Sequence, residues 1–179
     1  MKQKVPYIPK EFPPKSIKWD SIISQIVEAN RGIALFEGFL KSLISPEIFL
    51  SPLTTNEAVL SSRIEGTQAT FEDVVKLEAG VISPDTSESI KQDVQEIINY
   101  RNALQYAEEE LSHRPISLNL IKEIHRILLS SVRGKDRLLG EFRKTQNWIG
   151  PAGTPIEKAR FIPPEPIVLH EYLEQWRNF

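Results

Sequence analysis

The sequence contains no cysteine, which excludes disulfide bonds, thiolate metal sites and a cysteine nucleophile. Its three histidines, His113, His125 and His170, are too far apart along the chain to indicate a metal site. No apolar run approaches the roughly 20 residues that a membrane-spanning helix needs. The first residues also lack the apolar stretch of a signal peptide. We therefore expect a cytoplasmic protein with no metal site and no membrane contact.

A basic excess is also missing, because the formal net charge is -2. Nucleic-acid-binding domains usually carry a clustered positive charge, so we expect no nucleic-acid partner. The chain has 179 residues, of which 40% are hydrophobic and 26% charged. These values fit one globular domain of ordinary composition, with at most a small appendage.

Local catalytic signatures are absent as well. The pair Gly134-Lys135 is followed by Asp136 and lacks the upstream glycine of a GxxxxGK[ST] phosphate loop. There is no GxGxxG, no HExxH and no local signature of a Ser-His-Asp triad. His125 sits among apolar helical residues, where a packed histidine bonded to a backbone group is expected. We therefore predict no catalytic residue within these 179 residues.

Helical periodicity dominates what the sequence does contain. Four prolines in residues 1–17 predict an extended, proline-rich arm. The spacing of apolar residues then predicts helices. Their ranges are 18–29, 32–43 (ended by Pro46), 53–64, 70–78 (capped by Thr70), 87–111, a helix that begins after Ser117, and 167–179.

The amino-acid composition changes after residue 133, where glycine and proline become frequent. Two short runs of strand-forming residues, 146–149 and 159–162, flank the turn-rich sequence Gly150-Pro-Ala-Gly-Thr-Pro. This pattern predicts a β-hairpin over residues 146–162. The expected fold class is therefore all-α, a helical bundle with one β-hairpin.

One polar stripe marks the helix predicted at 53–64. Glu57, Ser61 and Glu65 are four residues apart, so they share one face, beside the apolar Leu60 and Ile64. A carboxylate at a helix C-terminus is disfavoured by the macrodipole by about 0.3–1 kcal/mol. A cationic partner from elsewhere would offset that cost. The alternative reading is a solvated charge at the end of a helix.

The run Ser61-x-x-x-Glu65-Gly66 resembles the inhibitory motif [S/T]-x-x-x-E-[G/N] of the Fic family, in the form carried on an N-terminal helix. A second block, Leu139 to Gly150 with Ala159 to Pro164, resembles the Fic flap hairpin and the segment that leads into it. The resemblance extends from about Trp19 to the end of the sequence. It divides the chain into an arm (1–17), a Fic N-terminal helical region (18–82) with the inhibitory helix (53–66), and the start of a Fic core (83–179) with the flap (146–162).

The resemblance implies an activity and a set of site residues. Fic enzymes transfer AMP from ATP, with Mg²⁺, to a hydroxyl of a target protein. Glu65 would pair with the arginine that holds the γ-phosphate, Ser61 would help to hold Glu65, and Gly66 completes the motif. The flap would dock an extended stretch of the target through its backbone and its apolar side chains, here Trp148, Ile149, Gly150, Phe161 and Ile162.

The sequence departs from the family at the catalytic motif HPFxxGNGRxxR, because neither HPF nor GNGR occurs in it. In relatives that motif would follow the last predicted helix, so the resemblance implies a truncated chain. We expect the isolated chain to be inactive and to bind no ATP tightly. Two alternatives stay open: an antitoxin-like module that inhibits a Fic partner in trans, and a helical interaction domain. A homodimer also stays open.

Overall fold

The computed structural model describes residues 5–9, 16–81, 83–130 and 138–178. Within these ranges the chain is all-helical, as the sequence predicts, and contains no β-strand. Its elements in chain order are η1 (Trp19–Ser21), α1 (Ile23–Lys41), α2 (Pro46–Ile64), α3 (Phe71–Glu78), α4 (Glu88–Leu111), α5 (Leu118–Leu128), η2 (Ile156–Lys158) and α6 (Pro166–Arg177).

The first helical segment differs from the prediction. Two helices, 18–29 and 32–43, were expected, whereas α1 is one continuous helix from Ile23 to Lys41. Gly32 lies inside it, and a glycine inside a helix costs only about 1 kcal/mol. The side chain of Asn30 donates to the carbonyl of Ile26 at 2.9 Å, inside the helix rather than in a turn. The Asn30-Arg31-Gly32 sequence is therefore no helix boundary.

The start of α2 is a second correction. Pro46 was expected only as the stop of the preceding helix, and the next helix was expected at residue 53. In the structure Pro46 is the first residue of α2, a position where the missing N–H costs nothing because it would be unpaired anyway. Pro52 lies within the helix, at the cost of one i→i−4 hydrogen bond. The helix that carries the Fic-like motif is thus longer than predicted.

The predicted helix starts at Thr70 and Ser117 are confirmed, and Ser87 forms a further cap that was not predicted. The hydroxyl of Thr70 accepts from the amide of Asp73 at 3.2 Å, and the Asp73 carboxylate accepts from the Thr70 amide at 2.9 Å, which is a capping box. Ser87 caps α4 and Ser117 caps α5 through their hydroxyl oxygens alone, which accept from the amides of Ile90 and Leu120. These caps fix the helix starts at the predicted residues.

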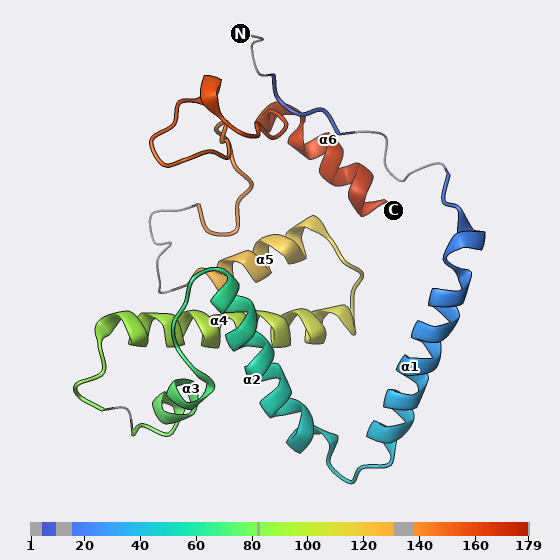
Figure 1. Cartoon of the computed structure of the whole chain (residues 1–179), viewed down its shortest axis with the longest axis vertical. Helices are drawn as coiled ribbons and strands as arrows, with labels where there is room; N and C mark the ends of the chain where they lie inside the picture. The colour runs from blue at the N-terminus through green and yellow to red at the C-terminus, as the bar shows by residue number, and fades with distance from the viewer. Residues whose placement is uncertain (1–4, 10–15, 82, 131–137, 179) are drawn as a thin grey trace.

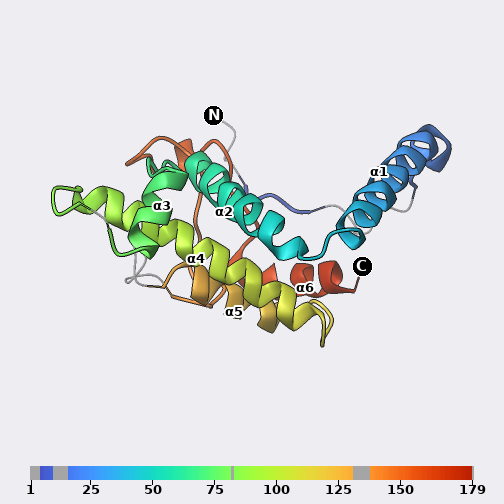
Figure 2. The same ribbon diagram turned by 90° about the horizontal axis from the view of Figure 1, so that it is seen from below.

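Helix α4 is the centre of the molecule. Helices α2 and α3 pack on one part of it, and α5 runs alongside it (Figures 1 and 2). The core cluster lies where α2, α3 and α4 meet, and its buried members are Ala58, Val59, Ala69, Val74, Val94 and Ile97. Arg101 of α4 ties the three helices together, because it bonds Thr55 of α2 at 3.3 Å and forms an ion pair with Glu78 of α3. The end of α2 is therefore anchored in the core.

Helices α1 and α6 lie at the periphery and contain no buried residue. Helix α1 stands away from the body in both views (Figures 1 and 2), and its apolar side chains, such as Phe36 and Phe39, are exposed. No described helix is long and apolar enough to cross a membrane. Of the predicted arm, residues 5–9 and 16–17 are described and form no helix; the remainder lies outside the described residues.

Candidate functional site

The carboxyl-terminal end of α2 carries the Fic-like motif. The helix ends at Ile64, and Glu65 follows as its C-cap with backbone angles φ −83° and ψ −2°. Gly66 adopts a φ of +104°, a conformation that glycine reaches without the Cβ strain of other residues. Its amide donates to the carbonyl of Arg63 at 3.0 Å. The glycine of the motif therefore ends the helix directly after the glutamate.

The polar stripe on α2 is present, but its internal contact differs from what the resemblance implies. The hydroxyl of Ser61 donates to Oε1 of Glu57 at 2.6 Å. Because a serine hydroxyl has one proton to donate, Ser61 does not also donate to Glu65. Ser61 thus holds the carboxylate one turn towards the N-terminus, and Glu65 stands by itself at the helix end.

Glu65 is exposed, and among the described residues it has no ion-pair partner. Lys76 of α3 pairs with Glu72 at 2.6 Å rather than with Glu65. The carboxylate lies at the negative end of the α2 dipole, which disfavours a negative charge. A cation brought to this helix end would therefore be bound favourably.

The chain is fixed again immediately beyond the motif. Thr67 is buried with 1% of its surface exposed. The amide of Gln68 donates to the carboxylate of Asp93, a buried residue of α4, at 2.6 Å. The motif is therefore held on one side by the buried face of α2 and on the other by this contact with α4.

The flap sequence forms a single antiparallel bridge rather than the predicted β-hairpin. The amide of Ile149 donates to the carbonyl of Phe161 at 2.9 Å, and the amide of Phe161 donates back at 3.2 Å. No strand is formed on either side within the described residues 138–178. Between the two bridge residues, turns and η2 take up the chain. The six prolines and glycines at 150–155 and 163–164 restrict the pairing to this single bridge.

The five predicted flap residues gather around this bridge. Trp148, Ile149 and Phe161 are partly exposed, whereas Ile162 is buried. The indole N–H of Trp148 donates to the carbonyl of Thr154 at 2.8 Å, across the turn that contains Gly150. The segment therefore offers apolar surface beside a short stretch of paired backbone.

The segment that leads into the flap is held against α5. The amide of Gly140 donates to Nδ1 of His125 at 2.9 Å, so this ring nitrogen carries no proton. The prediction that His125 is bonded to a backbone group is confirmed. The guanidinium of Arg143 donates to the carbonyl of Pro164, which joins the two ends of the flap.

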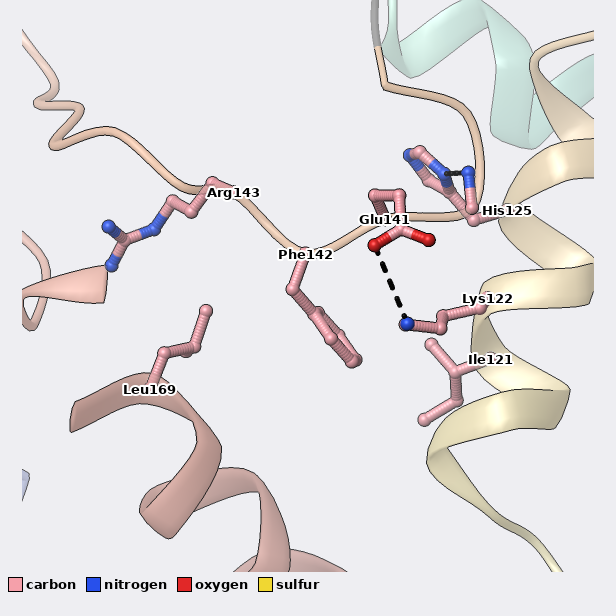
Figure 3. Close-up of a pocket in the computed structure, with 8 residues that line it drawn as sticks. Ile121, Lys122, His125, Glu141, Phe142, Arg143 and Leu169 are labelled. Atoms are coloured by element: carbon pink, nitrogen blue, oxygen red, sulfur yellow. Dashed lines mark hydrogen bonds and ion pairs between the residues drawn. The ribbon is translucent and has the colours of Figure 1, made fainter. Parts of the chain in front are cut away.

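Sequence reasoning missed a cavity at this place. A space of about 300 Å³ lies between α5, residues 140–143 and the start of α6. In Figure 3, Ile121, Phe142 and Leu169 face it, and Lys122 points towards Glu141 at 3.6 Å. The Lys122 amine also lies 5.6 Å from the centre of the Phe142 ring. The amine and the carboxylate are paired with each other, and the lining of the cavity is mainly apolar.

No group of three His, Cys, Asp or Glu side chains among the described residues is arranged to hold a metal ion. The motif on α2 and the flap are therefore the two features that carry the functional interpretation. One offers an exposed carboxylate, and the other offers backbone and apolar side chains.

Comparison with known protein families identifies the helical part. The Fic/DOC family N-terminal model matches residues 23–109, which span α1, α2, α3 and most of α4. The motif at Ser61, Glu65 and Gly66 lies inside the matched range. A comparison with curated proteins finds no match. Residues 23–109 of this chain are therefore a Fic/DOC family N-terminal region.

Proposed function

We propose that this chain is the N-terminal portion of a Fic-type protein AMP transferase, which carries an autoinhibitory carboxylate on α2 and a target-docking flap at 146–162. The observation that carries the proposal is the Ser61-x-x-x-Glu65-Gly66 motif at the end of α2, inside the matched residues 23–109. AMP would pass from ATP, held with Mg²⁺, to a hydroxyl of a target protein. The catalytic HPFxxGNGRxxR segment does not occur among these residues and would be supplied from outside them.

The position of Glu65 suits an inhibitory role. Its carboxylate is exposed at the negative end of a helix dipole, so a guanidinium would stabilise it. An arginine paired in this way cannot also hold the γ-phosphate of ATP, because both anions need the same fork of N–H donors. Glu65 and the productive ATP pose would then exclude each other.

The flap would supply the second part of the function. A backbone bridge flanked by the partly exposed Ile149 and Phe161 suits an extended target segment. Such docking would position the target hydroxyl without a chemical contribution from this chain. The proposal therefore assigns no catalytic residue to it.

The test joins these 179 residues to the catalytic segment of a relative and follows transfer of labelled AMP. Glu65→Ala should raise the rate at least tenfold, which corresponds to a decrease of about 1.4 kcal/mol in the activation free energy. Glu57→Ala is the matched control: it removes a carboxylate from the same stripe, about two helix turns away, and should change the rate less than twofold. Equal rates for Glu65→Ala and the parent, with both folded, would refute the inhibitory role.

The same reagents separate action in cis from action in trans. The unlinked chain is added to a separate Fic catalytic subunit that lacks an inhibitory helix. Inhibition by the parent chain, relieved by Glu65→Ala, would identify an antitoxin-like module. Inhibition only in the fused protein would identify an enzyme portion that acts within its own chain.

A further inference from the structure

The N-terminal arm lies on the flap. The amide of Tyr7 donates to the carbonyl of Ile162 at 2.8 Å. The Tyr7 ring stands 5.7 Å from the Phe161 ring, centre to centre, with an angle of 45° between the planes. In Figure 1 the arm, in blue, passes the chain ahead of α6. Two segments more than 150 residues apart in the sequence are thus joined by one backbone hydrogen bond and one aromatic contact.

The contact falls on the outer edge of the flap. Both backbone groups of Phe161 face Ile149 across the bridge. The carbonyl of the next residue, Ile162, accepts from the amide of Tyr7 and not from Ile149. The Ile162 carbonyl therefore points away from the bridge, where an added strand would bind, and Tyr7 takes this position.

The arm is held by few contacts. Within residues 5–9 no other backbone hydrogen bond joins the arm to the body. Tyr7 remains 48% exposed, and Val5 and Ile8 are each 75% exposed. Pro6 and Pro9 have no N–H to extend the pairing, but they restrict the arm to extended conformations. The arm is thus pre-organised for the edge and still easily displaced.

We propose that the outer edge of the flap at Phe161 and Ile162 is a docking surface for an extended peptide with an aromatic side chain, and that residues 5–9 are its intramolecular occupant. An incoming peptide would take over the Ile162 carbonyl and the Phe161 ring, so it must displace Tyr7. That this peptide belongs to a target protein rests on the proposed function. The occupancy itself rests only on the contacts described above.

The test uses the 179-residue chain and a fluorescent peptide of residues 4–10 as the probe, followed by anisotropy. A tethered occupant competes at an effective concentration in the millimolar range. Tyr7→Pro removes both the amide donor and the ring, and should therefore lower the Kd of the peptide at least tenfold relative to the parent chain. Tyr7→Phe keeps the amide and the ring and should match the parent within twofold.

Adding Phe161→Ala to Tyr7→Pro should reverse the gain at least tenfold, and circular dichroism checks that each variant keeps its helices. Equal affinity of the parent and Tyr7→Pro, no binding to either, or binding unaffected by Phe161→Ala would each overturn the proposal. None of these measurements needs AMP transfer. A failure here therefore leaves the Glu65 test unaffected, and a failure of the Glu65 test leaves the occupancy of the edge standing.

Discussion

Gly140 offers the sharpest stability test of the packing between α5 and the segment before the flap. Its φ is +71°, and a Cβ added there would lie 2.8 Å from the carbonyl oxygen of Lys122 and 2.8 Å from a guanidinium nitrogen of Arg126. The arginine can move, but the carbonyl belongs to the backbone of α5. The left-handed conformation costs a non-glycine residue about 1–2 kcal/mol, and overpacking against a rigid neighbour costs about 1–3 kcal/mol. Gly140→Ala should therefore destabilise the chain by about 2–5 kcal/mol.

Gly80 provides the matched control. Its φ is +69°, and an added Cβ would meet nothing within 4 Å. Gly80→Ala should therefore show only the conformational cost of about 1–2 kcal/mol. Urea unfolding followed by circular dichroism measures both, and an unchanged m-value confirms that the variants unfold from a similar compact state. If Gly140→Ala proves no more destabilising than Gly80→Ala, the result would contradict the close approach of residue 140 to the backbone of α5.

Two further predictions concern the helices around α4. Asn99 is buried and donates to the carbonyl of Leu128 at 3.4 Å and to that of Ser130. Asn99→Ala should therefore lower the free energy of unfolding, measured in urea, by about 1–3 kcal/mol. An equal loss for Asn102→Ala, at an exposed position of the same helix, would contradict this role. The hydrogen bond from Arg101 lowers the pKa of Glu78, so its stabilisation is present above the ordinary glutamate pKa and is lost as the pH falls through the lowered one. Glu78→Gln should be less stable than the parent by about 0.2–1 kcal/mol at pH 7, with a gap that closes in acid; a gap of the same size at pH 3 would refute the ion pair as its cause.

Local signals in the sequence predicted helix caps, which depend only on residues close together in the chain. The hydroxyls of Thr70 and Ser117 cap helices where expected, because a cap needs only the residues of the first turn. The same local reasoning misplaced the boundary at Pro46. Proline suits the first turn of one helix as well as the end of another. Which of the two occurs depends on the core contacts of the helix that follows.

Long-range contacts account for most of the site that the sequence did not predict. The spacing of four along α2 placed Ser61 beside two glutamates, but it did not predict which of them would accept its hydrogen bond. The bond from Tyr7 to Ile162 joins residues that no periodic pattern relates. The β-hairpin predicted over residues 146–162 is not formed, and only the bridge between Ile149 and Phe161 is present. The surrounding prolines, which cannot donate to a ladder, limit its length.

The backbone around Glu65 suits the inhibitory role that we propose for this side chain. The buried Ser62 fixes the last turn of α2, and the bond from Gln68 to Asp93 fixes the chain three residues beyond the glutamate. Gly66, with its φ of +104°, makes the reversal between them. Only the side-chain torsions of Glu65 remain free. Pairing with a cation would therefore cost at most about 2 kcal/mol in side-chain rotamer entropy and no backbone entropy. A carboxylate presented in this way can bind and release a guanidinium while the fold that carries it stays unchanged.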